Sequence, residues 1–108
     1  MKQRQQPLPE CETETAVQAL AAALAALAKP GEVRAFLEDL CTPAELEAMA
    51  DRWRVVPLLR QGLPYRDIHD RTQVSVTTIG RVARTLEHGA GGYGAAVERQ
   101  FPRLAASH

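Results

Sequence analysis

Residues 63–86 read LPYRDIHDRTQVSVTTIGRVARTL, and the rest of the chain is organised around this segment. Two short helices are expected here, over about 64–72 and 76–88, with Gln73 and Val74 forming the turn between them. Ser75 is a favoured N-cap for the second helix, because its hydroxyl can accept a hydrogen bond from a backbone N–H of the first turn. The second helix carries small hydroxyls and arginines rather than acids. The stretch therefore predicts a helix-turn-helix of the kind that reads DNA.

We call the predicted helix-turn-helix the reader. The composition of the whole chain favours an all-α protein. Of the 108 residues, 45% are hydrophobic but only 5% are aromatic. Alanine, leucine and valine dominate, which favours helices over a sheet or an aromatic-lined cofactor pocket. A chain of this length supports one small domain that can share its core with a second copy. We expect one domain over residues 14–101 with the reader at 63–88, a disordered N-terminal tail at 1–13 and a C-terminal tail at 102–108.

Apolar residues upstream of the reader recur at helical spacing. Val17, Leu20, Leu24 and Leu27 form a stripe among alanines, which predicts a helix over 14–28 that can approach another helix closely. A second helix is expected over 32–40. Downstream of the reader, a glycine-rich loop at 89–94 precedes a last short helix over about 95–101.

The third helix has clear start and stop signals. Thr42 is the expected N-cap, Pro43 the first helical residue, and Glu45 the partner that completes a capping box. Gly62 is the expected end, so this helix should be the longest. Pro57 lies inside it and removes a backbone hydrogen bond. The helix therefore either kinks near residues 53–57 or stops before Pro57.

The net charge of zero conceals two halves of opposite sign. Residues 32–51 hold six acids and one base, whereas residues 52–84 hold seven arginines and two aspartates. The basic half coincides with the reader, which suits an anionic partner. A solvated charged surface explains the same pattern, and charge alone does not separate the two interpretations.

The sequence lacks the patterns that enzymes and metal proteins require. It has no nucleophile and base at a recognisable spacing, no paired carboxylates in a plausible cleft, and no metal motif, since Cys11 and Cys41 have no metal-ligand spacing. His69 is a lone histidine, which is far more often a packing or surface residue than a metal or pH sensor. No apolar run is long enough for a bilayer. We expect no enzyme, no cofactor, no metal, no membrane partner and a cytoplasmic location.

Several segments together resemble a known family. LCTPAELEAMADRWRVVPLLRQG at 40–62, TTIGRVARTLEHG at 77–89, and GY and VER within 92–99 are similar to the Trp repressor superfamily, and within it to the YerC/YecD group. The resemblance covers more than half of the chain, from Phe36 to Arg99. It implies a Trp-repressor-like, intertwined all-helical homodimer whose two readers enter successive major grooves of double-stranded DNA. It also implies a transcriptional regulator, and favours a repressor.

The resemblance places the DNA contacts on the reader. Threonine hydroxyls can bond base edges or phosphates, and arginine can bind guanine or phosphate, so these residue types suit the task. Arg81 and Arg84 lie further along the helix and are expected to clamp phosphates. The simpler interpretation of each arginine is an exposed solubilising charge, which stays equally open for Arg60 and Arg71. The implied DNA-binding residues are Arg66, Ser75, Val76, Thr77, Thr78, Gly80, Arg81 and Arg84.

The resemblance also implies a possible effector pocket between the third helix and the recognition helix. Its matched positions are Thr42, Arg52, Val56, Arg81, Val82 and Thr85. Val82 stands where the family has a glycine that leaves room for an indole, and its branched side chain would fill that space. Thr85 stands where a corepressor-binding serine is found. We therefore expect no response to tryptophan, while another small effector, or none, remains open.

Two further positions depart from the family within the helix-turn-helix. His69 replaces a small residue between the two helices, so its ring should splay them or point outward. Gln73 replaces the turn glycine and must tolerate a strained turn or reshape it. Together with Pro57, these departures motivate an alternative function, a helical dimerisation or protein-interaction module that keeps the fold without specific DNA binding.

Overall fold

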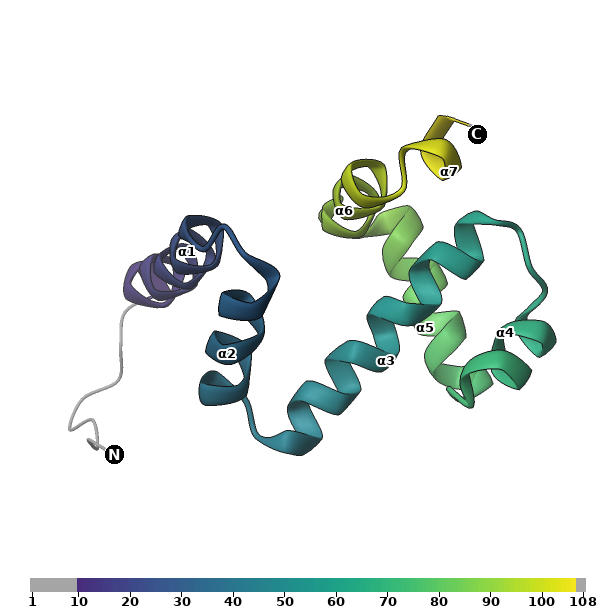
Figure 1. The fold of residues 1–108 in the computed structure, drawn as a ribbon, viewed down its shortest axis with the longest axis horizontal. Helices are drawn as coiled ribbons and strands as arrows, with labels where there is room; N and C mark the ends of the chain where they lie inside the picture. The colour runs from purple at the N-terminus through teal and green to yellow at the C-terminus, as the bar shows by residue number, and fades with distance from the viewer. Residues whose placement is uncertain (1–9, 107–108) are drawn as a thin grey trace. The chain divides into compact units, whose positions relative to one another are not determined.

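The computed structural model describes the backbone of residues 10–106 and the side chains of residues 12–104. The regular elements in this range are all helices, which confirms the all-α prediction (Figure 1). Their bounds are α1 Glu10–Ala26, α2 Pro30–Leu40, α3 Pro43–Arg60, α4 Tyr65–Thr72, α5 Val76–His88, α6 Gly92–Gln100 and α7 Pro102–Ala106.

The helices fall into two compact units within the stretch 14–101 that was expected to form one domain. The N-terminal unit ends at Cys41 and contains α1 and α2, and the C-terminal unit begins at Thr42 and contains α3 to α7. Every buried apolar side chain among the described residues lies in the C-terminal unit. The division follows from this distribution, because only one of the units has a core of its own.

Both predicted tails contain helix. Helix α1 begins at Glu10, within the segment expected to be disordered, while residues 1–9 lie outside the described residues. Helix α7 occupies Pro102–Ala106 in the predicted C-terminal tail. Its first residue is a proline, whose missing N–H is no loss at a helix start. The preceding helix also starts earlier than expected, at Gly92, because Gly91 adopts a φ of 90° and serves as its N-cap.

A reciprocal cap starts α3, as predicted. The Thr42 hydroxyl accepts the Glu45 N–H at 3.1 Å, and the Glu45 carboxylate accepts the Thr42 N–H at 2.8 Å. The pKa of Glu45 lies below its ordinary value. The larger cause is the hydrogen bond with the Thr42 backbone, and the smaller is the interaction with the Thr42 side chain. Helix α3 spans 18 residues and is the longest described helix. It continues through Pro57, so the alternative of a helix that stops before this residue is wrong.

The core of the C-terminal unit forms where α3 packs against α4, α5, α6 and α7. At its rim, the rings of Trp53 and Tyr93 lie 6.5 Å apart at 40°, which joins α3 to α6. Burial of this apolar surface fixes α4 and α5 on the side of α3. The buried apolar residues are Val55, Val56, Ile68, Val74, Ile79, Val82 and Val97.

Candidate nucleic-acid interface

Helices α4 and α5 form the predicted helix-turn-helix and pack against each other and against α3 (Figure 1). Between them, Gln73 has a φ of 63°, in the left-handed region where a Cβ is unfavourable. Glycine usually occupies such a position. The strained turn expected at Gln73 is therefore present, and glutamine accommodates it.

Ser75 caps α5, as the sequence predicted. Its hydroxyl accepts the Thr78 N–H at 3.1 Å and donates to the Thr78 hydroxyl oxygen at 3.0 Å. The hydrogen of the Ser75 hydroxyl is thus used within the protein, whereas the Thr78 hydroxyl keeps its own hydrogen for another acceptor. Thr77 is exposed, and its hydroxyl bonds to no described residue. At the start of α5, Thr77 and Thr78 are therefore the hydroxyls available to a partner.

The predicted DNA contacts share the solvent-facing side of the helix-turn-helix. Ile79 and Val82, on the opposite side of α5, are buried in the core. Val76 is 52% exposed and lies in the first turn of α5, beyond the edge of the core. Exposed are Arg66, Ser75, Val76, Thr77, Arg81 and Arg84, and half-exposed are Thr78 and Gly80.

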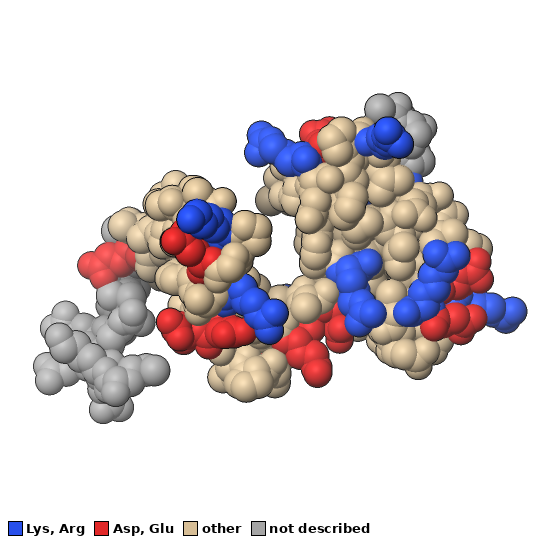
Figure 2. All heavy atoms as spheres, viewed as in Figure 1, with Lys and Arg blue, Asp and Glu red and all other residues tan. Residues whose placement is uncertain are grey.

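The arginines of this surface are not neutralised by the described residues. Arg66, Arg81 and Arg84 make no ion pair or hydrogen bond within that range. By contrast, Arg34 binds Glu38 at 2.8 Å and Arg54 lies 3.7 Å from Asp51. In Figure 2, positive side chains project from the C-terminal unit, with acidic ones beside some of them. Exposed, unpaired guanidinium groups are available to phosphate oxygens.

Tyr65 belongs to the same surface, although the sequence analysis did not include it. The phenol starts α4 and is 41% exposed. A Cβ placed at Gly80 would lie 3.8 Å from a Tyr65 ring carbon and 3.6 Å from Arg84 Nη1. The ring from α4 and the guanidinium from α5 therefore flank the bare backbone of Gly80. The sequence signal for this contact was a tyrosine near the start of the first helix of the helix-turn-helix, since a tyrosine hydroxyl can bind phosphate.

The structure brings only part of the predicted effector pocket together. Arg52 and Arg81 line a common hollow of about 400 Å³ between α3, the turn and the start of α5, which Asp51, Gln73 and Thr78 also line. A carboxylate and two guanidinium groups give this hollow a mixed charge. The Asp51 carboxylate lines this hollow and also lies 3.7 Å from the guanidinium of Arg54.

The other positions of the predicted pocket lie elsewhere in the C-terminal unit. Val56 is 0% and Val82 is 1% exposed, and both belong to the core. Thr42 caps α3, and Thr85 borders a separate hollow beside the glycine-rich loop. The six positions therefore do not surround one cavity within the C-terminal unit. The branched side chain of Val82 is packed in the core. This agrees with the expectation that it fills the space that a glycine leaves open in the family.

The described residues 10–106 carry neither a membrane-spanning helix nor a metal-binding cluster. None of these helices combines the length and apolar character needed to cross a bilayer. Within the same described part of the chain, no three His, Cys, Asp or Glu side chains are grouped so that they could hold a metal ion.

Comparison with known proteins assigns the fold to a family. The model of the Trp repressor protein family matches residues 15–101. The uncharacterized protein YerC of Bacillus subtilis (strain 168) is 41% identical over 64 residues, which span 59% of this chain and 62% of that protein.

Two solved structures are similar as well. A TrpR-like protein from Eubacterium eligens ATCC 27750 has a TM-score of 0.73 and 38% identity, over 79% of this chain and 88% of that one. A candidate Trp repressor from Staphylococcus aureus has a TM-score of 0.73 and 32% identity, over 79% of this chain and 85% of that one. The family model covers most of this chain, and the chain belongs to the Trp repressor family.

Proposed function

We propose that this protein is a sequence-specific, DNA-binding transcriptional regulator that acts as a homodimer. The observation that carries the proposal is the outer side of α5, where Thr77, Arg81 and Arg84 are exposed and form no bond with a described residue. The opposite side of α5 is fixed in the core through Ile79 and Val82. A rigid helix with free donors on one side is suited to the major groove.

The residues divide into two tasks. Thr77 and Thr78 lie in the first turn of α5, where a recognition helix contacts base edges. Arg66, Arg81 and Arg84 bind phosphates and fix the register on the duplex. Tyr65 joins them as a phosphate contact, because this residue is 41% exposed and its ring lies beside Gly80.

The homodimer is supported by the N-terminal unit. None of its described side chains is buried, although Val17, Leu20 and Leu40 are apolar and exposed. Two helices without a core are not stable alone in water. A second copy that covers this apolar surface would stabilise both chains. Binding of the dimer to successive major grooves would then require its two helix-turn-helix units to lie about 34 Å apart, one turn of DNA.

The proposed regulator does not use tryptophan as its corepressor. The supporting observation is Val82, whose packed side chain occupies the position that the family keeps free for an indole. The hollow beside Arg52 and Arg81 is lined largely by polar residues. Isothermal calorimetry with tryptophan should therefore give no binding heat and no change in DNA affinity.

The test begins with the selection of preferred sequences from random double-stranded DNA. Binding of the wild-type dimer to a selected fragment should weaken steeply with salt, since each phosphate contact releases a counterion. Replacement of Arg81 and Arg84 by alanine should lower the slope of log K against log [salt] by about 1 for each arginine. Arg34→Ala is the matched control, because it removes the same charge from a residue already paired with Glu38. Absence of wild-type binding at low salt would overturn the proposal.

The alternative of a protein-interaction module loses much of its motivation. It rested on His69, Gln73 and Pro57. The turn accommodates His69 and Gln73, α5 keeps its N-cap, and α3 continues through Pro57. Capture of a specific protein partner together with failure to select any DNA sequence would restore it.

A further inference from the structure

The turn between α4 and α5 buries a residue whose backbone lies outside both helices. Val74 is 5% exposed, and its side chain belongs to the core. Its N–H and C=O are therefore withdrawn from water and need other partners, because an unpaired buried peptide group is strongly unfavourable.

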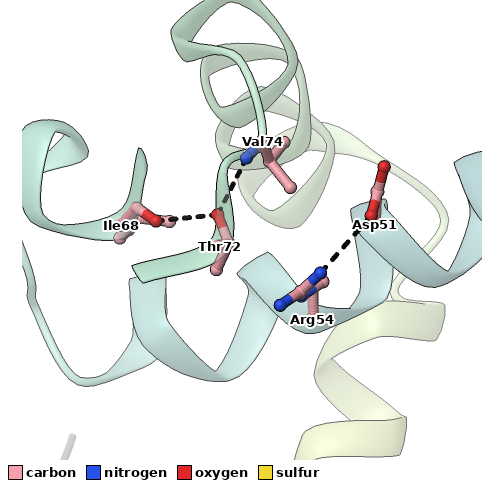
Figure 3. A network of polar contacts seen from close by, with 5 residues as sticks. All are labelled: Asp51, Arg54, Ile68, Thr72 and Val74. Carbon is pink, nitrogen blue, oxygen red and sulfur yellow. Dashed lines mark hydrogen bonds and ion pairs between the residues drawn. The ribbon is translucent and has the colours of Figure 1, made fainter. Parts of the chain in front are cut away.

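Both partners come from the last turn of α4. The Thr72 hydroxyl accepts the Val74 N–H at 3.1 Å and donates to the Ile68 carbonyl at 2.7 Å (Figure 3). The imidazole of His69 lies against the other end of the same residue, with Nδ1 at 2.8 Å from the Val74 carbonyl oxygen. A carbonyl oxygen can only accept, so Nδ1 carries the hydrogen.

We infer that His69 is a positioning residue, which with Thr72 clamps Val74 and thereby sets the direction of the DNA-reading helix. The N–H of Val74 belongs to the peptide plane before its Cα, and the C=O belongs to the plane after it. Fixing both planes fixes the two dihedral angles of Val74. This residue immediately precedes Ser75, the N-cap of α5, so its dihedrals determine how α5 leaves α4.

The side chain of Gln73 completes the fixed turn. Its amide nitrogen donates to the Asp70 carbonyl at 3.2 Å, and its backbone N–H donates to the His69 carbonyl at 2.7 Å. Carbonyls at a helix end otherwise lack partners. Glycine at position 73 would relax the turn but could not supply the amide. His69 and Gln73 thus both bind backbone carbonyls of the turn through their side chains. Two small residues at these positions could not make these hydrogen bonds.

The inference rests on the proposed DNA-binding function, but its first test does not need DNA. In the full-length wild-type protein, ¹H–¹⁵N spectra at a pH where the ring is neutral should give His69 the signature of the Nδ1–H tautomer. An exposed imidazole favours the other tautomer, so the Nε2–H signature would overturn the clamp.

The second test compares two replacements of His69 on DNA. Asparagine keeps a donor close to the Nδ1 position, whereas leucine keeps similar volume without a donor. His69→Leu should weaken binding to a selected sequence at least about tenfold while leaving non-specific binding unchanged, and His69→Asn should restore most of that loss. Circular dichroism of both variants must retain the helical signal of the wild type.

Each outcome of this comparison decides one claim. Equal affinities of the leucine and asparagine variants for the selected sequence would overturn the clamp while leaving DNA binding intact. Failure of the wild type to bind any DNA would instead overturn the proposed function, and the tautomer would then decide the clamp by itself. If His69→Leu does not fold, the wild-type spectrum and the asparagine variant still provide the decision.

Discussion

The two units of this chain use apolar residues in opposite ways. In the C-terminal unit, α3 to α7 bury seven apolar side chains, six of them at 0% or 1% exposure. In the N-terminal unit, the stripe of α1 is predicted from the same helical spacing, yet Val17 is 61% and Leu20 is 38% exposed. Helical spacing therefore identifies an apolar face, but it does not identify what covers that face. The C-terminal unit has a core of its own, whereas in the proposed homodimer a second copy covers the apolar face of the N-terminal unit.

The largest effect is expected in the core of the C-terminal unit. Ile79→Ala removes a side chain that is 0% exposed, and it should lower the free energy of unfolding by about 2–5 kcal/mol. Urea denaturation followed by circular dichroism measures the loss. Leu40→Ala, at a 51% exposed position of the N-terminal unit, is the comparison and should cost less. An Ile79→Ala cost no larger than that of Leu40→Ala would break the contrast between the units.

A charge on the uncovered stripe tests what covers it. Leu20→Glu should weaken self-association, because covering a leucine with a second copy contributes about 1.5–3 kcal/mol. Sedimentation equilibrium should then give a higher dissociation constant than that of the wild type. Gln18→Glu adds the same charge at an exposed polar position of α1 and is the control. If Leu20→Glu leaves the oligomeric state unchanged, the stripe is not a dimer contact.

Buried polar groups of the C-terminal unit should be sensitive to loss of a partner. Thr72→Val keeps the shape of the side chain but leaves the buried Val74 N–H without an acceptor. The expected cost is about 1–3 kcal/mol in thermal or urea unfolding. Thr72→Ser retains the hydroxyl and should recover most of this stability. A valine variant as stable as the serine variant would mean that water replaces the hydroxyl.

The boundary between the units is also a helix start, with a smaller expected effect. Thr42→Ala removes the hydroxyl that accepts the Glu45 N–H and should destabilise the C-terminal unit by about 1 kcal/mol. Thr42→Ser preserves the cap and serves as the control in the same melting experiment. Indistinguishable melting temperatures for the alanine and serine variants would show that the cap does not limit stability.

The smallest effect is the pH dependence of the same cap. The Thr42 N–H holds the pKa of Glu45 below its ordinary value of 4.5. The stabilisation is therefore present above the pKa of the unfolded chain and is lost as the pH falls through the lower pKa of the folded protein. Unfolding measured across this acidic window should be less pH-dependent for Glu45→Gln than for the wild type. Equal pH dependence in the two proteins would contradict this assignment.

Local signals in the sequence were sufficient where side chain and backbone interact within one turn. The spacing of Thr42, Pro43 and Glu45 predicted the start of α3, and Ser75 predicted the start of α5, because a cap depends only on neighbouring residues. The start of α1 at Glu10 carried no such signal. Pro102 is the first residue of the predicted C-terminal tail, although proline also suits the first position of a new helix, as in α7.

Tertiary arrangement limited the prediction of the site. Periodicity predicts the outer side of α5, but it does not tell where the core ends, and apolar Val76 lies beyond that edge at 52% exposure. The sequence offered two orientations for His69, splaying the helices or pointing outward. Its ring instead bonds to the backbone of Val74, five residues along the chain. That contact depends on the reversal of the chain at Gln73, which no pairwise spacing describes.

The left-handed conformation of Gln73 also bears on the thermodynamics of recognition. Glycine moves freely between left- and right-handed regions, so a glycine turn carries conformational entropy that binding must remove. Glutamine at φ 63° has already lost that freedom when the protein folds. Formation of the proposed complex with DNA should therefore have a less unfavourable entropy for the wild type than for a Gln73→Gly variant, even where the two proteins have similar stability. The conformational entropy of residue 73 is thus lost during folding and not during the proposed binding to DNA.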